Sequence, residues 1–186
     1  MPLHDFHDGN GPVSAHQHVN GGGWVADTAY VNPSAYVGPN AQVFSNAWVY
    51  DSAHVSDSVL VFGNARVYNN AHVSGSARVY GDALVFGNAL VYGNAHVYGS
   101  ARVAGSAQVF GNAEVSGQSK IFGSAQVDYD VHDQDVSGPA APAVPGKGRY
   151  AAPADRCECG AATAFGCGRG QPGHFDWCPW VETIGK

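Results

Sequence analysis

The side chains best suited to chemistry are four cysteines and a histidine near the end of the sequence: Cys157, Cys159, Cys167, His174 and Cys178. Thiolates and imidazole form a soft tetrahedral set that suits zinc, and clustered cysteines in a reducing compartment favour a metal over disulfides. A segment of about thirty residues buries too little core to fold alone, so the metal would supply its folding energy. A tetrahedral site takes four ligands and five candidates are present, so one alternative is a site made of the four cysteines. The other interpretation is four reduced cysteines without a metal.

Histidine supplies the second group of candidate residues. One copy of His16 and His18 from each of three chains would offer six imidazoles around an axis, enough for an octahedral metal. A solvated or packed histidine-rich terminus is the favoured interpretation of these two residues. His54, His72 and His96 lie within a repeat, where stacked surface histidines are more often polar ladder residues than ligands.

The element that positions these repeat histidines has a period of six residues. Valine recurs at every sixth position from Val25 to Val127, with isoleucine once at Ile121, eighteen times without an insertion. Most of these positions lie in units that begin Ala-x-Val, and some units have the full form Ala-x-Val-aromatic-Gly-Asn, as in 83–88. A short fixed period indicates stacked, equivalent turns of chain, so the sequence predicts a solenoid.

Each unit predicts one buried and one exposed side. The alanine and the valine are two residues apart, so both point to the same side of an extended segment, and the residue between them points outward. A glycine follows two residues after the aliphatic position in ten units and supplies the positive-φ turn geometry that β-branched residues resist. These glycines are Gly63, Gly75, Gly81, Gly87, Gly93, Gly99, Gly105, Gly111, Gly117 and Gly123.

This hexapeptide pattern resembles the left-handed parallel β-helix family, in which three hexapeptides make one triangular coil. The resemblance covers Val25 to Val127 and implies an all-β fold, a left-handed parallel β-helix of about six triangular coils. Residues eighteen apart then share a face. The first face presents Trp24, Gln42, Leu60, Arg78, His96 and Glu114. The second presents Tyr30, Trp48, Arg66, Leu84, Arg102 and Lys120. The third presents Tyr36, His54, His72, Leu90, Gln108 and Gln126.

Apolar side chains on these faces predict self-association. Outward Leu60, Leu84 and Leu90, with ladders of aromatic rings beside them, would expose more apolar surface than a monomer carries. The family usually forms parallel trimers, so the resemblance implies a homotrimer.

The composition excludes several classes of function. Charged residues make up 13% of the chain and the formal net charge is −6, so there is no electrostatic footprint for nucleic acid. No apolar run approaches the length of a membrane span, and the N-terminus lacks a signal pattern. We therefore expect neither a nucleic acid nor a membrane as partner.

An enzyme is the alternative function. Many left-handed β-helix proteins are acyltransferases and some are γ-class carbonic anhydrases, with sites between subunits. The acyltransferases usually interrupt the coil with a loop and add a C-terminal helix, and this sequence has neither pattern. His54, His72 and His96 do not reproduce the spacing of the hydratase ligands. We therefore expect no catalytic residues.

A further resemblance points to viruses. The stretch Asn-Gly-Gly-Gly-Trp-Val-Ala-Asp-Thr-Ala at 20–29 resembles the opening of β-helical proteins encoded by tailed bacteriophages. The Cys-x-Cys-Gly-Ala and His-x-x-Trp-Cys-Pro motifs are similar to small zinc-binding tails of phage-encoded proteins. This resemblance implies a structural Zn²⁺ ion held by Cys157, Cys159, His174 and Cys178. It also implies a trimeric capsid decoration (cement) protein or short spike, a structural virion protein assembled in the host cytoplasm on the major capsid protein or another virion protein.

The chain is expected to divide into four segments. They are an N-terminal arm or cap (1–23), the β-helix (24–131), a Pro/Ala-rich linker (132–155) and the zinc-binding tail (156–186), which would form a small knob. The arm would fold against the first coil or against a partner, and we expect it to anchor the protein to the shell. The acidic stretch after Val127 is expected to stop further strand pairing.

Overall fold

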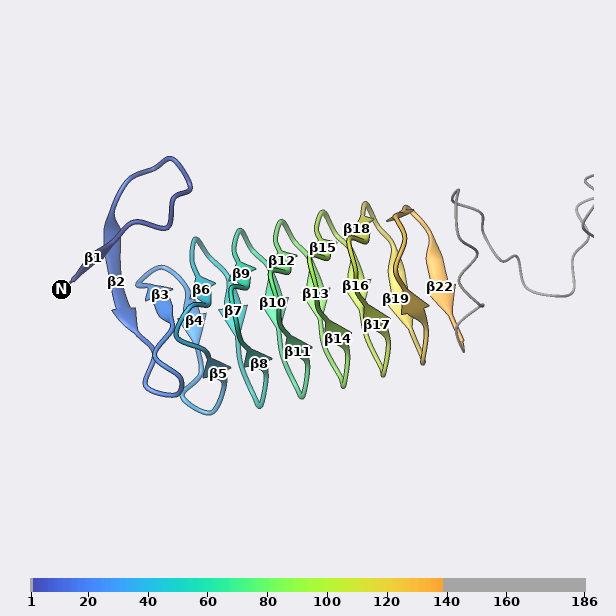
Figure 1. The fold of residues 1–186 in the computed structure, drawn as a ribbon, viewed down its shortest axis with the longest axis horizontal. Coiled ribbons are helices and arrows are strands. Elements are labelled where there is room, and N and C mark those ends of the chain that lie inside the picture. Colours follow the sequence, from blue (N-terminus) through green and yellow to red (C-terminus); the bar gives the residue numbers. More distant parts are fainter. Residues whose placement is uncertain (1, 139–186) are drawn as a thin grey trace, which may run out of the picture. The chain divides into compact units, whose positions relative to one another are not determined.

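The computed structural model describes residues 2–138, which form a stack of short strands and tight turns (Figure 1). From β3 (Trp24–Ala26) onward, successive strands pass in turn through three parallel sheets, so three strands complete one coil. The described residues are thus an all-β parallel β-solenoid of about six turns. Within them no helix is long and apolar enough to cross a membrane.

From β3 onward each sheet takes every third strand, and sheet 1 also contains β1 and β2. Sheet 1 contains β1 (Leu3–His4), β2 (Val13–Gln17), β3, β6 (Gln42–Val43), β9 (Leu60–Val61), β12 (Arg78–Val79), β15 (His96–Val97), β18 (Glu114–Ser116) and β21 (Val131–His132). Sheet 2 contains β4 (Tyr30–Val31), β7 (Trp48–Val49), β10 (Arg66–Val67), β13 (Leu84–Val85), β16 (Arg102–Val103), β19 (Lys120–Phe122) and β22 (Asp135–Ser137). Sheet 3 contains β5 (Tyr36–Val37), β8 (His54–Val55), β11 (His72–Val73), β14 (Leu90–Val91), β17 (Gln108–Val109) and β20 (Gln126–Val127).

The register between coils confirms the predicted coil of three hexapeptides. Arg66 of β10 pairs with Trp48 of β7 on one side and with Leu84 of β13 on the other, eighteen residues away in each direction. The backbone N–H of Arg66 donates to the carbonyl oxygen of Ala83 in the next coil at 2.9 Å. The three predicted faces are therefore the outer surfaces of sheets 1, 2 and 3.

The interior is filled by the repeated valines and alanines, as predicted. The repeat valines from Val37 to Val127 and Ile121 are completely buried in one continuous core, and Val31 in the first coil is only partly covered. Valine and alanine suit this interior because their short side chains fill a narrow cross-section without leaving a void. Apolar burial along this column is the main source of stability.

The corners confirm the predicted role of glycine. All ten predicted glycines have φ between 66° and 75°. Four units without glycine at this place put Ser45, Asp51, Asp57 and Asn69 in the same left-handed region, at φ of 56–59°. These are mostly the residue types that tolerate a positive φ, because a short polar side chain can bond locally. Asp57 also bonds to the next coil, because its carboxylate accepts a hydrogen bond from the backbone N–H of Gly75 at 2.8 Å.

Aromatic rings after the valines stack into columns along the solenoid. One column runs through Phe44, Phe62, Tyr80 and Tyr98 with centroid separations of 4.9–5.0 Å. A second runs through Tyr50, Tyr68 and Phe86 at 4.9 and 5.0 Å. Stacked rings of this kind contribute beyond their buried area, so the columns tie neighbouring coils together.

The N-terminal segment folds as a cap on the first coil. Strand β1 pairs antiparallel with β2, and β2 pairs antiparallel with β3. His4 stacks on Trp24 with centroids 4.2 Å apart, and Phe6 stacks on Phe44 at 4.9 Å and extends that ring column. The sequence left open whether this segment folds against the first coil or against a partner. In the structure it packs on the first coil, so its folding requires no partner.

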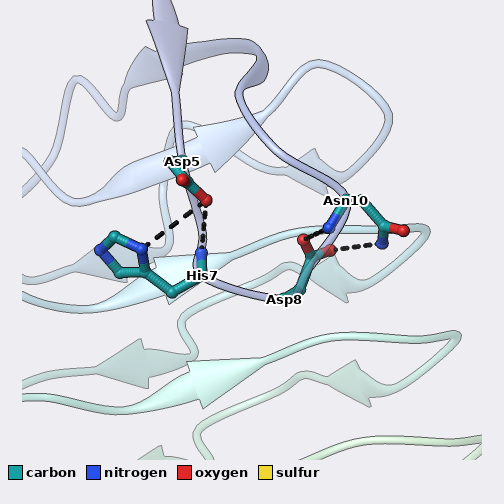
Figure 2. Close-up of polar contacts among 4 residues, drawn as sticks. All are labelled: Asp5, His7, Asp8 and Asn10. Atoms are coloured by element: carbon teal, nitrogen blue, oxygen red, sulfur yellow. Dashed lines mark hydrogen bonds and ion pairs between the residues drawn. The ribbon is translucent and has the colours of Figure 1, made fainter.

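The loop between β1 and β2 is held by its own carboxylates (Figure 2). Asp5 accepts a hydrogen bond from the backbone N–H of His7 at 2.8 Å. Asp8 accepts one from the backbone N–H of Asn10 at 3.0 Å and one from the Asn10 side-chain amide at 2.9 Å. These bonds to Asn10 lower the pKa of the Asp8 carboxyl. Hydrogen bonds within the loop thus add to the packing of Phe6 on the solenoid.

The expectation that strand pairing stops after Val127 is wrong. Strand β21 pairs with β18, and β22 pairs with β19, but the offset falls from eighteen residues to sixteen at Val115 and Val131. Side chains replace the backbone acceptors that the shorter coil lacks. The backbone N–H groups of Glu114, Gln118 and Gln134 donate to Asp130 Oδ1 (3.0 Å), Asp133 Oδ1 (2.8 Å) and Ser119 Oγ (3.2 Å), respectively. The acidic stretch caps the last coils by accepting hydrogen bonds.

Candidate functional site

The predicted zinc ligands lie outside the residues that the structure describes. Cys157, Cys159, His174 and Cys178, and their rival Cys167, all belong to the range 139–186. The zinc site stays a prediction. Among residues 2–138, no group of three or more His, Cys, Asp or Glu side chains is arranged to hold a metal ion.

The repeat histidines stack along sheet 3. The His54 ring lies 5.3 Å from that of His72 and 4.3 Å from that of Tyr36, in both cases nearly parallel. His96 lies on sheet 1, edge-on to Tyr80 at 6.4 Å. The structure therefore brings together two of the three histidines and separates the third.

Burial lowers the pKa of His54, and the neighbouring His72 lowers it further. The folded state then favours the neutral imidazole. A histidine with a lowered pKa contributes stability that is complete above its usual value of 6.5 and is lost as the pH falls below that value and through the lowered pKa of the folded state.

We expect the melting temperature to fall when the pH is lowered from about 7 to about 5, because protonation places charge in a ring column. Thermal melts monitored by circular dichroism measure this. His54→Gln is expected to flatten the profile, whereas His96→Gln, on the other sheet, serves as the matched control. A profile unchanged by His54→Gln would contradict this role of the column.

The N-terminal histidines are engaged within the chain. His16 Nδ1 lies 2.9 Å from Asp27 Oδ1, and Ser14 Oγ donates to the other carboxylate oxygen at 2.7 Å. These two contacts lower the pKa of Asp27. His18 is buried, with Nε2 3.0 Å from the carbonyl oxygen of Ala35. Both rings thus hold the cap on the first coil.

Charge is distributed unevenly over the three outer faces. Sheet 3 presents Tyr36, His54, His72, Leu90, Gln108 and Gln126, none of which carries a charge when histidine is neutral. Sheet 2 presents Arg66, Arg102 and Lys120, three of the four lysines and arginines in residues 2–138. The periodicity assigned these residues to their faces, but the contrast in charge emerges only when the faces are compared.

Two exposed aromatic residues of the repeat lie together in the first coils of sheet 2. Tyr30 and Trp48 are each 46% exposed, and their ring centroids lie 5.2 Å apart. The guanidinium carbon of Arg66 lies 5.6 Å from the Trp48 ring centroid, in a cation–π contact. This arrangement is an accessible aromatic surface with a cation beside it.

Less apolar surface is exposed along the rest of the repeat than the sequence suggested. Leu60, Leu84 and Leu90 are half-buried, because the outward side chains of adjacent coils cover one another. The stacked rings of the two main columns are likewise buried or half-buried. The leucines therefore expose less apolar surface for self-association than expected, and sheet 3, whose outward strand positions include no Asp, Glu, Lys or Arg, is the better candidate face.

The fold and these surfaces define a β-solenoid repeat protein. Comparison with protein families agrees: the YdcK Beta solenoid repeat matches residues 61–75 and 77–93, in the middle of the repeat. A search of curated proteins gave no significant match, and a search of solved structures gave none either.

Proposed function

We propose that the chain is a structural virion protein, a homotrimer that decorates a bacteriophage capsid or forms a short spike on the particle. The observation that carries the proposal is the uninterrupted solenoid: eighteen hexapeptides follow one another without an inserted loop. A coil without insertions provides a stiff, regular body and side faces for assembly. The opening motif at 20–29, which resembles that of phage-encoded β-helical proteins, supports this function. The hexapeptide pattern supports a left-handed coil.

The proposed trimer contact is sheet 3. Interface cores are depleted of charged residues, and the outward strand positions of this face include no Asp, Glu, Lys or Arg. Contacts repeated around a closed three-fold axis would bury the same face in every protomer. Three copies on one particle site would then add their individual contacts, so the affinity of the assembly exceeds that of one chain.

The C-terminal tail would carry the structural Zn²⁺ on Cys157, Cys159, His174 and Cys178, or on a set that includes Cys167. Such a site folds a short segment into a knob that caps the trimer or binds the next virion partner. The N-terminal cap, packed on its own first coil, is a rigid end that offers a preformed surface to the shell.

Particles provide the direct test of the virion role. We expect an antibody raised against the solenoid to detect the chain in phage particles banded on a density gradient. The infected-cell lysate, probed with the same antibody, is the control for expression. A chain abundant in the lysate but missing from intact particles would contradict the virion role.

A further inference from the structure

One line of side chains on sheet 2 is accessible and chemically distinct from the rest of the solenoid. It runs through Tyr30, Trp48, Arg66, Leu84 and Arg102, in successive coils paired in register. Coil-to-coil spacing is set by strand pairing, so the side chains follow one another at about 4.8 Å. We call this line the sheet 2 ridge.

The cations of the ridge are available to a ligand. Within residues 2–138, neither Arg66 nor Arg102 takes part in an ion pair, and both are exposed. Lys120, the next cation along the sheet, differs because Asp135 lies 3.7 Å from its ammonium group. Two guanidinium groups two coils apart, one of them beside the Trp48 ring, are therefore the cations of this face that have no carboxylate partner within residues 2–138.

The charge distribution around the sheet 2 ridge determines which sign of charge a ligand should carry. Residues 2–138 contain eleven aspartates and glutamates against four lysines and arginines, and three of those four cations lie on sheet 2. An anionic ligand would be repelled by most of the molecule and attracted by this face.

The combination of rings and guanidinium groups selects the chemistry of the partner. The flat apolar faces of Tyr30 and Trp48 can stack on the C–H face of a sugar ring, and each guanidinium can bind a carboxylate with two parallel hydrogen bonds. Two cations are few for a nucleic acid, whose affinity comes from many phosphate contacts. The coil spacing is close to the length of one sugar ring in an extended chain.

We propose that the sheet 2 ridge binds a linear polysaccharide of carboxylated sugars, with sugar rings on Tyr30 and Trp48 and carboxylates on Arg66 and Arg102. The site lies on a different sheet from sheet 3, the face proposed for the trimer contact. It does not rest on the virion role, because the ridge is complete within one chain.

Calorimetric titration of the full-length chain with oligogalacturonate tests the site. We expect binding that weakens as salt is added, because the guanidinium–carboxylate pairs are exposed. The methyl-esterified oligomer has the same sugar ring without the charge and is the matched ligand control. It should bind at least tenfold more weakly.

Three variants separate the ridge from general charge attraction. Trp48→Ala and Arg66→Gln are each expected to lower the affinity for oligogalacturonate at least tenfold with an unchanged circular dichroism spectrum. Arg78→Gln removes an exposed cation from sheet 1 and should leave the affinity unchanged. The proposal is overturned if oligogalacturonate does not bind, or if Arg78→Gln weakens binding as much as Arg66→Gln. Tighter binding of oligothymidylate than of oligogalacturonate would also overturn it and would identify a nucleic-acid surface.

Discussion

Replacing Val85 with aspartate is expected to unfold the solenoid. Val85 is completely buried and lies in register between Val67 and Val103 of the adjacent coils. A carboxylate there would lose its hydration in an interior made of valine and alanine. The expected loss of stability is about 4 kcal/mol or more. Circular dichroism should show the loss of the β-rich spectrum or a large drop in melting temperature.

Val85→Ile is the matched control for this variant. Ile121 occupies the corresponding interior place two coils further along the same sheet and is also completely buried. The larger aliphatic side chain should therefore cost about 1–3 kcal/mol, less than the aspartate. If Val85→Asp kept the spectrum and the melting temperature of the parent protein, the assignment of valine to the interior would be wrong.

Replacing Gly93 with valine is expected to be the second most damaging change. Gly93 has φ of 75°, and a Cβ atom there would lie 2.9 Å from the carbonyl oxygen of Gly111 in the next coil. The left-handed backbone and the crowding together should cost about 3 kcal/mol. Chemical denaturation with urea measures this difference in the free energy of unfolding.

Gly93→Asp is the control that distinguishes backbone strain from the mere presence of a side chain. Asp57 stands in the same column of corners with φ of 56° and accepts a hydrogen bond from the Gly75 N–H group. An aspartate at position 93 can make the same bond to Gly111, so we expect a clearly smaller loss than with valine. Equal losses for the two variants would contradict this account of the corners.

The middle of the solenoid could be predicted from the sequence because one period determines both the interior and the register. Moving the chain by one residue would bring Arg66 into the core and push Val67 out, so a single alignment of coils is possible. The glycines at the corners could be predicted for a similar reason, because few residue types adopt a positive φ readily.

The two ends could not be predicted in the same way because their contacts occur once. His4 stacks on Trp24 and Phe6 stacks on Phe44, but neither contact belongs to a repeated sequence pattern from which it could be predicted. Likewise, Asp130 is one of several acidic residues after Val127, and its bond to the Glu114 N–H group depends on the altered length of the coil. The acidic residues alone predicted that strand pairing would stop after Val127. In the structure the Asp130 carboxylate instead accepts a hydrogen bond.

The candidate surfaces could be predicted from the sequence only in part. Periodicity placed Trp48, Arg66 and Leu84 on one outer face, but it does not say how far neighbouring coils cover each side chain. In the structure Trp48 stays exposed while Leu84 is half-buried, so the accessible surface is aromatic and cationic rather than aliphatic. The zinc-binding tail, which falls outside residues 2–138, stays a prediction from cysteine spacing.

Light scattering on the full-length chain as it leaves a sizing column tests the proposed assembly most directly, with zinc measured on the same peak. Light scattering gives the mass itself, so the elongated shape of a solenoid does not distort the result. We expect three times the chain mass of 19.3 kDa and one zinc ion per chain. A monomer at every concentration tested would contradict the trimer formed through sheet 3.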